Sequence, residues 1–260
     1  MTSRTFSYRA RQIHRYLGVF IGIQFVLWTA GGLYFSWTNL DEIHGDHLRT
    51  RTPALRGDIV LASPAGAIAQ LHAAEPVDSL AGIDLVDVLG RATYRVHYFT
   101  SQGDKAVRRT RLADAASGTL REPIAREEAI AAARAAMRDD LRLVGAELLT
   151  EASVDGHHEY RGGSLPAWAV SFDGPERATA YVPVDLGRVD RVRNDRWRAF
   201  DFLWMLHTMD YRGRDDINNT ILRVLSVLGI ATILSGFTLF ALTSRPLRRR
   251  LARRRDAAPA

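Results

Sequence analysis

The sequence predicts an α+β protein in which two membrane-spanning helices flank one extracytoplasmic domain. Two observations support this fold class. Two uncharged apolar stretches, Leu17 to Phe35 and Val224 to Ser244, lie near the two ends of the chain. Between them the pattern changes twice from helix-like to strand-like, each time as one helix followed by an antiparallel meander. The 260 residues therefore divide into two spans and an enclosed, twice-repeated α+β segment.

The two apolar stretches have the length of membrane spans. A helix rises about 1.5 Å per residue, so about 20 residues cross a hydrocarbon layer of about 30 Å. A buried helix of a soluble core normally meets a charge sooner. A cleaved signal peptide has a shorter apolar run and a small-residue cleavage site, whereas the first stretch ends in Tyr34, Phe35, Ser36 and Trp37. Aromatic side chains are typical of a membrane–water interface. We expect spans over residues 17–37 and 220–244.

Charge predicts the orientation of these spans. The segment 1–16 and the segment 245–260 are rich in arginine, whereas the inner flanks of the spans mix arginine with aspartate and glutamate. Positive residues stay on the cytoplasmic side. We therefore expect two cytoplasmic tails, 1–16 and 245–260, at a bacterial inner membrane, with the domain between the spans outside the cytoplasm.

Composition limits the chemistry. The chain has no cysteine, which excludes disulfides, thiol nucleophiles and Cys-based zinc sites. Its formal net charge is +6, but the excess lies in the tails, where membrane topology and anionic lipid headgroups explain it. Membrane lipids are thus expected partners and nucleic acid is not.

The first round of the enclosed segment covers residues 59–122. A helix is expected from Pro64, after a cap at Ser63, because proline suits the first turn of a helix. Apolar runs at 83–89 and 94–99 read as strands. A turn follows at 114–118, where aspartate opens the turn and glycine supplies a positive φ.

The second round covers residues 123–195 and repeats this order. A helix with an alanine stripe is expected to begin near Ile124 and to continue to Met137. Strands are expected at 143–149, at 167–172 and before the turn 185–187. Apolar and polar residues alternate along 168–173, which is typical of a strand with one buried face. A junction, 38–58, links the first span to this domain, and an amphipathic interfacial segment, 196–219, leads to the second.

Three pieces of the second round resemble the PepSY module. They are the helix opening Ile124 to Ala129 (Ile-x-x-Glu-Glu-Ala), the strand Trp168 to Val170 (Trp-x-Val), and the turn Val184 to Gly187 (Val-Asp-x-Gly). Each piece is short, and their order makes the resemblance moderately specific. The resemblance implies a tandem PepSY-like domain, one module in each round.

The membrane segments resemble PepSY-associated transmembrane proteins. The first span opens with residues 14–18 (His-Arg-Tyr-Leu-Gly) and continues through 28–33 (Trp-Thr-Ala-Gly-Gly-Leu). The approach to the second span, residues 206–211, and the pair Ser235-Gly236 also resemble that family. Larger members, some of which resemble ferrisiderophore reductases, have four or more spans. This chain has two, so the resemblance does not imply that it carries electrons across the membrane by itself. The resemblance implies a role in restraining peptidases or in iron and redox systems.

Three places carry histidines of interest. His14 lies at the cytoplasmic edge of the first span, where an ionisable residue is costly unless it is paired or binds something. The family resemblance implies that His14 is a candidate ligand for b-type haem, because imidazole is a good ligand for haem iron. The alternative is an interfacial anchor beside Arg15. A homodimer would supply a second His14.

A second candidate follows the first span. Asp41, His44, Asp46 and His47 are all residue types that coordinate metals. If this segment is helical, His44 and His47 share a face and can reach one ion of zinc, iron or copper. A polar, hydrated junction is the alternative.

The third candidate is His207, which follows an aromatic run and precedes Asp210 and Tyr211. We expect an amphipathic helix on the outer membrane surface. His207 is the second candidate haem ligand and can approach His44 and His47, whereas His14 lies on the order of 30 Å away across the span.

Small residues predict close packing of the spans. Gly18 and Gly22 form a Gly-x-x-x-Gly pair, and Gly229, Thr232 and Gly236 form a second stripe. The stripes suit contact between the two spans or between two chains of a homodimer.

No hydrolase, metalloprotease, phosphate-loop or dinucleotide motif is present, so no catalytic residues are assigned. Two functions stay open. The first is an extracytoplasmic binding or accessory module that meets a periplasmic or inner-membrane protein partner. The second is a haem- or metal-binding electron-transfer component related to ferrisiderophore reduction.

Overall fold

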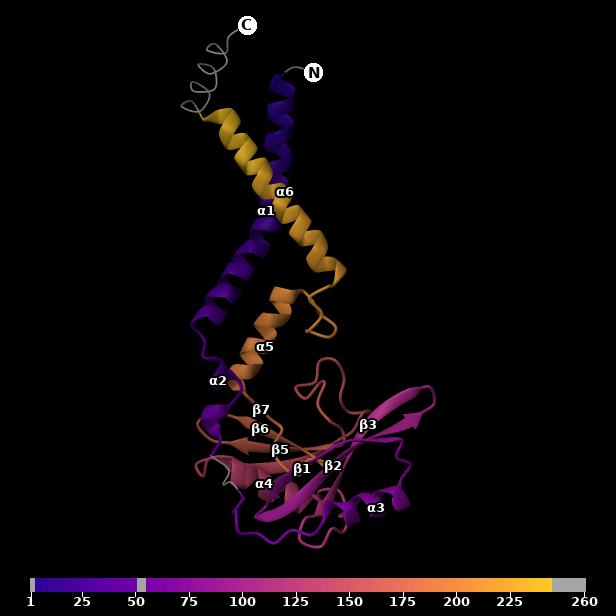
Figure 1. Ribbon diagram of the computed structural model, residues 1–260. Helices are drawn as coiled ribbons and strands as arrows, with labels where there is room; N and C mark the ends of the chain where they lie inside the picture. Colours follow the sequence, from indigo (N-terminus) through magenta and orange to yellow (C-terminus); the bar gives the residue numbers. More distant parts are fainter. Residues whose placement is uncertain (1–2, 51–54, 245–260) are drawn as a thin grey trace. The chain divides into compact units, whose positions relative to one another are not determined.

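The structure is a computed structural model that describes residues 3–50 and 55–244 (Figure 1). The predicted tail 245–260 lies outside the described residues. The chain forms two compact units. One contains the residues up to Thr38 together with those from Phe200 onward, and the other contains Asn39 to Ala199.

The first unit is helical. Its two long helices are α1 (Ser3–Trp37) and α6 (Thr220–Thr243). Within them, Arg11–Trp37 and Thr220–Ala241 are long and apolar enough to cross a membrane, which agrees with the two predicted spans. Large apolar side chains such as Val26 and Phe237, each 68 % exposed, cover their outer surfaces. Helix α1 begins well before the predicted span because residues 3–16 contain neither proline nor glycine to stop it.

Helices α1 and α6 cross within this unit (Figure 1). Asn219 caps α6 by accepting a hydrogen bond from the backbone N–H of Leu222 at 2.9 Å. Of the two small-residue stripes, only that of α6 is used in the crossing. A Cβ on Gly229 would lie 3.1 Å from the ring of Phe25, whereas Cβ atoms on Gly18 and Gly22 would meet nothing within 4 Å.

Helix α5 (Asp195–Thr208) covers only the first half of the predicted interfacial segment 196–219. It ends because Met209 takes a left-handed conformation with φ of 55°, and residues 209–219 form an irregular connection to α6. The carboxylate of Asp210 organises this connection by accepting hydrogen bonds from the backbone N–H groups of Arg212, Gly213 and Asp216.

The second unit begins with the short helix α2 (Leu40–Ile43) and the 3-10 turn η1 (Asp46–Leu48). Helix α3 (Pro64–Ala74) follows, with Ser63 as its cap as predicted: the Ser63 hydroxyl accepts from the Ala65 N–H at 3.3 Å. A meander of β1 (Ser79–Val88), β2 (Arg91–Gln102) and β3 (Lys105–Asp114) then forms a three-stranded antiparallel sheet. Helix α3 packs its buried Ala67 and Leu71 against Tyr94, Val96 and Tyr98 of β2.

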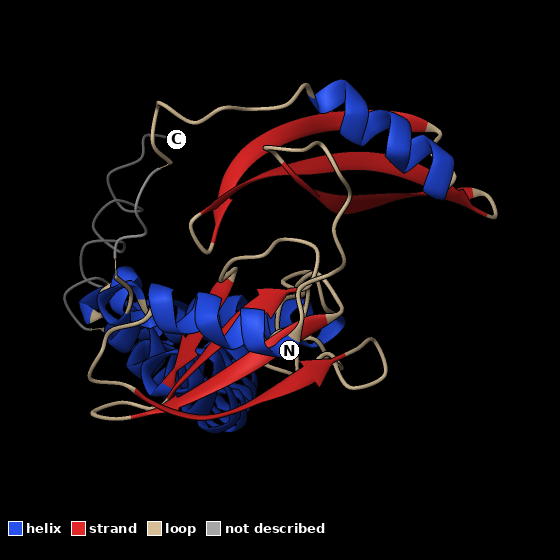
Figure 2. Cartoon of the chain, turned by 90° about the horizontal axis from the view of Figure 1, so that it is seen from below, coloured by secondary structure: helices blue, strands red, loops and turns tan. Residues whose placement is uncertain are grey.

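The second round adds helix α4 (Arg126–Ala136) and a four-stranded antiparallel sheet. Its strands are β4 (Arg142–Leu149), β5 (Ala167–Asp173), β6 (Ala178–Pro183) and β7 (Arg191–Asn194). The buried alanines of α4 let the helix lie close on Val170 and Phe172, so the predicted alternation along 168–173 is confirmed. Figure 2 shows one helix lying across each sheet.

The start of α4 differs slightly from the expectation near Ile124. The helix begins at Arg126 after Ala125, whose side chain cannot accept a hydrogen bond. Glu128 takes over half of the capping, because its carboxylate accepts from the Ala125 N–H at 3.2 Å.

The two predicted turns are present but differ in their chemistry. Asp114 accepts from the N–H groups of Ser117 and Ala116, and these bonds hold the pKa of its carboxyl below the usual value. Asp185 is instead partly buried, and the desolvation of its carboxyl raises its pKa. Gly187 has a φ of 68°, and a Cβ there would lie 2.9 Å from Val88, so the turn of the second round packs against the first.

The two rounds share one hydrophobic core, in which Val88 and Leu112 of the first meet Ile124 and Val182 of the second. The unit is therefore a mixture of helices and two antiparallel sheets, as predicted. That each round is a PepSY module stays a prediction.

Candidate functional site

The segment after the first span folds into two short turns separated by a glycine. Asn39 starts α2, because its side chain accepts from the Asp41 N–H at 2.9 Å. Gly45 then adopts a left-handed conformation with φ of 78°, and η1 follows. Ile43 and Leu48 anchor the segment in the unit, being 1 % and 5 % exposed. The polar side chains between these anchors are left near the surface.

This geometry decides how the predicted metal-binding residues lie. Gly45 interrupts the helix between His44 and His47, so the two imidazoles do not share a helical face. His44 lines one pocket with Asp46, and His47 lines another. Across the described parts of the chain, no three or more His, Asp or Glu side chains are grouped to hold a metal ion. The metal site at Asp41, His44, Asp46 and His47 therefore gains no support and stays a prediction.

His47 instead pairs with a carboxylate from the second round. Its Nε2 lies 2.9 Å from Oε2 of Glu176, whose side chain is only 13 % exposed. Arg196 approaches the other carboxylate oxygen, with its Nε 3.7 Å from Oε1. Within the described residues, neither His47 Nδ1 nor Glu176 Oε1 has a hydrogen-bond partner, although both atoms are buried. Buried polar atoms are usually satisfied, so this pair retains unused hydrogen-bonding capacity.

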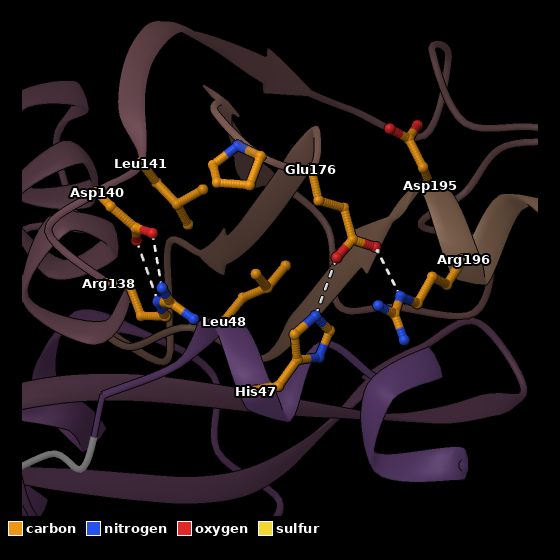
Figure 3. A pocket seen from close by; sticks show the side chains of 9 residues that line it. His47, Leu48, Arg138, Asp140, Leu141, Glu176, Asp195 and Arg196 are labelled. Atoms are coloured by element: carbon orange, nitrogen blue, oxygen red, sulfur yellow. Dashed lines mark hydrogen bonds and ion pairs between the residues drawn. The ribbon is translucent and has the colours of Figure 1, made fainter. Parts of the chain in front are cut away.

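The His47–Glu176 pair borders a pocket of about 380 Å³ (Figure 3). Three apolar side chains, Leu48, Leu141 and Pro175, line part of it. Charged groups of both signs flank this apolar surface. Arg138, held by Asp140 at 2.6 Å, lies on one side, and Glu176 and Arg196 lie on the other.

Asp195, at the start of α5, completes the charged border. Burial would raise the pKa of its carboxyl, but hydrogen bonds from the guanidinium groups of Arg177 and Arg198 hold the pKa below its usual value. The border therefore offers fixed positive and negative charges around an apolar floor. Such a site suits a small ligand that carries both signs of charge.

In the helical unit, His14 contacts α6. Its Nδ1 lies 2.7 Å from the hydroxyl of Ser235, and a Cβ on Gly236 would lie 3.1 Å from its Cε1. The Ser235-Gly236 pair thus provides a hydrogen bond and the space for one imidazole. This contact orients the ring and leaves Nε2 as the nitrogen available to a ligand.

His207 lies among aromatic rings of α1 and α5. Its ring centroid is 5.6 Å from that of Trp28, 5.8 Å from that of Phe35 and 6.2 Å from that of Trp204. The end of α5 thus packs along α1, and Asp210 lies beyond the end of the helix rather than on the face of His207. The sequence predicts an amphipathic helix through this segment, but the helix ends at Thr208, because the left-handed conformation of Met209 turns the chain.

The two candidate haem ligands are far apart. Trp28, which contacts His207, follows His14 by 14 positions in α1, or about 21 Å along the helix axis. This separation agrees with the expectation that they cannot share a ligand. Within the described residues of the helical unit, one imidazole lies at each of these two levels.

Sequence reasoning missed Glu176, Arg138 and Arg196. Glu176 is 129 positions from His47, and no local pattern links it to the segment after the first span. A comparison with protein-family models, curated proteins and solved structures found no match to this chain.

Proposed function

We propose that this chain is a two-pass inner-membrane protein whose α+β unit is an extracytoplasmic binding module, and that the pocket beside His47 is its recognition site. The order of helices and strands supports kinship with the PepSY-associated membrane proteins that the sequence resembles. The arginine-rich tails support an arrangement in which both termini are cytoplasmic.

The observation that carries the proposal is the division of the pocket into an apolar floor and charged sides. Leu48, Leu141 and Pro175 can contact an apolar side chain. Arg138 pairs with Asp140, and Arg196 pairs with Glu42 and Glu176, but each guanidinium has further N–H donors for a carboxylate. The carboxylate of Glu176, which His47 and Arg196 contact, can also receive an ammonium group. A short zwitterionic peptide has these three features, and a pocket of about 380 Å³ falls in the size range of small-ligand sites.

Calorimetry on the full chain in nanodiscs tests this proposal. The probe is alanyl-leucyl-alanine, compared with the same peptide blocked at both ends. We expect the free peptide to bind and the blocked one to bind at least ten-fold more weakly. Glu176→Gln should lose this preference, whereas Asp173→Asn, on the exposed ion pair with Arg142, should keep it. Equal binding of both peptides would contradict the proposal.

Topology is tested separately. Because the chain has no cysteine, Asp104→Cys and Asp256→Cys each introduce a single thiol. A membrane-impermeant maleimide applied to intact spheroplasts should label position 104 and spare position 256. The reverse pattern would overturn the orientation.

A second candidate function is electron transfer through haem, and the oriented imidazole of His14 favours it. Haem would supply one-electron chemistry, and His14 would hold it through Nε2. The optical spectrum of the detergent-purified chain tests this. If the chain transfers electrons through haem, the spectrum should show a Soret band that weakens in His14→Ala. A colourless protein without bound metal would exclude this function.

A further inference from the structure

A second pocket, of about 320 Å³, opens beside the segment after the first span. It is separate from the recognition site beside His47. Its lining consists of His44, Asp46 and Arg49 from this segment and of residues 190–193 from β7 and its approach.

Backbone carbonyl groups hold two of the arginines that line this pocket. Arg49 donates to the carbonyl of Val189 at 3.3 Å. Arg191 donates to the carbonyls of Arg161 and Gly162 at 3.1 and 3.0 Å. Carbonyl groups position a guanidinium without neutralising its charge. Both side chains stay reachable, with 35 % and 34 % of their surfaces exposed.

Two carboxylates of the pocket also contact these arginines. Asp46 lies 4.0 Å from Arg49, and Asp190 lies 3.3 Å from Arg191 while also accepting from the hydroxyl of Tyr160. With Arg193, the lining carries three arginines against two aspartates. The adjoining chain adds to the positive field, because residues 188–198 contain five arginines and two aspartates.

We propose that this pocket binds a phosphate group. The planar fork of a guanidinium matches two oxygens of a phosphate, and two anchored arginines from different segments of one pocket can hold one tetrahedral anion. Arginines that are already bound to carbonyl groups lose little further side-chain freedom on binding. His44 adds a further donor to the lining.

The phosphate has two sources. His44 follows Trp37, the last residue of the candidate span, by seven positions, so an anionic lipid headgroup is one source. A soluble phosphate compound outside the membrane is the other. Both present the same group to the two arginines.

The test uses the full chain in nanodiscs. In phosphatidylcholine discs, inorganic phosphate is titrated at constant ionic strength against chloride, and the thermal unfolding midpoint is recorded. In discs that contain equal amounts of phosphatidylcholine and phosphatidylglycerol, native mass spectrometry records which lipid stays bound. A phosphate-dependent rise in the midpoint identifies the soluble source, and preferential retention of phosphatidylglycerol identifies the lipid source.

Variants assign either response to the pocket. The double variant Arg49→Gln with Arg191→Gln should weaken the response at least ten-fold, and Arg142→Gln, on the exposed side chain of β4, should leave it unchanged. Arg191→Lys keeps the charge but loses the fork, and it should weaken binding several-fold, so it serves if the double variant fails to fold. Glu176→Gln should not change phosphate binding, which separates this site from the recognition site. An unchanged response in both arginine variants, or no response of the wild type to either source, would overturn the proposal.

Discussion

Gly45 and Val192 meet so closely that a side chain on the glycine has no room: its Cβ would lie 2.8 Å from Cγ1 of Val192. Gly45 also needs its positive φ to turn the chain between His44 and His47. The two pockets that this segment lines therefore depend on one glycine and on one contact with β7.

Gly45→Ala should destabilise the α+β unit by about 2–4 kcal/mol, since a left-handed alanine costs about 1 kcal/mol and the clash adds about 1–3 kcal/mol. Gly90→Ala is the matched control, because Gly90 has the same φ of 78° but nothing within 4 Å of its Cβ position. Thermal unfolding followed by tryptophan fluorescence compares the two. Equal losses for the two variants would show that the contact with Val192 is unimportant.

The contact between α1 and α6 yields a second prediction. Gly236→Ala places a methyl group 3.1 Å from His14 Cε1, whereas Gly18→Ala places one in open space. We expect Gly236→Ala to lower the thermal midpoint of the helical unit in detergent, and Gly18→Ala to leave it unchanged. Ser235→Ala should have a smaller effect, about 0.6 kcal/mol, as is average for hydrogen bonds between membrane helices. Circular dichroism at 222 nm measures all three, and a loss in Gly18→Ala alone would contradict the observed helix contact.

The carboxyl of Asp210 should make the stability of the folded chain depend on pH in the acid range. Hydrogen bonds from the N–H groups of Gly213 and Asp216 hold the pKa of its carboxyl below the unfolded value of about 3.9. A lowered pKa stabilises the folded state above the unfolded pKa, and this stabilisation is lost as the pH falls through the folded pKa. The thermal midpoint should therefore fall as the pH drops below about 4.

Asp210→Asn isolates this contribution. In the wild type, Asp210 Oδ1 accepts from the N–H of Gly213, and Oδ2 accepts from the N–H of Asp216 at 3.0 Å. The amide of the variant keeps an oxygen acceptor for Gly213 but places an NH₂ donor opposite the N–H of Asp216. We expect a loss of about 1 kcal/mol at pH 7 and a flatter acid limb. Asp104→Asn, on an exposed hairpin, serves as the control. An acid limb as steep in Asp210→Asn as in the wild type would assign the acid sensitivity to other groups.

Local sequence patterns predicted the elements that depend on local physics. The spans follow from uninterrupted apolar residues, the start of α3 follows from Ser63 and Pro64, and the buried face of β5 follows from alternation. The candidate sites depend on contacts that are distant in sequence. His47 and Glu176 are in contact although they lie 129 positions apart, and no spacing within residues 41–47 reports that contact. Likewise, α5 ends at a left-handed Met209. Methionine normally continues a helix, so the residue type at this position does not indicate a helix end.

The hydroxyl of Tyr98 should make the stability of the folded chain depend on pH in the alkaline range. Its ring is 1 % exposed, and its hydroxyl donates to the carboxylate of Glu75, which Arg111 also contacts at 2.9 Å. Burial first, and then the bond to Glu75, raise the pKa of Tyr98 to about 12. The unfolded value is about 10, so the folded state keeps a proton that the unfolded state loses, and the stability should fall as the pH rises from about 10 to about 12.

Tyr98→Phe cannot ionise, so it should be less stable at pH 8 but lose less stability between pH 10 and 11. Thermal midpoints at these pH values measure the difference, with Tyr211→Phe at an exposed tyrosine as the control. If Tyr98→Phe loses as much stability as the wild type over this range, the alkaline sensitivity arises elsewhere, and the other buried tyrosines with raised pKa values, Tyr160 and Tyr181, are the next to substitute.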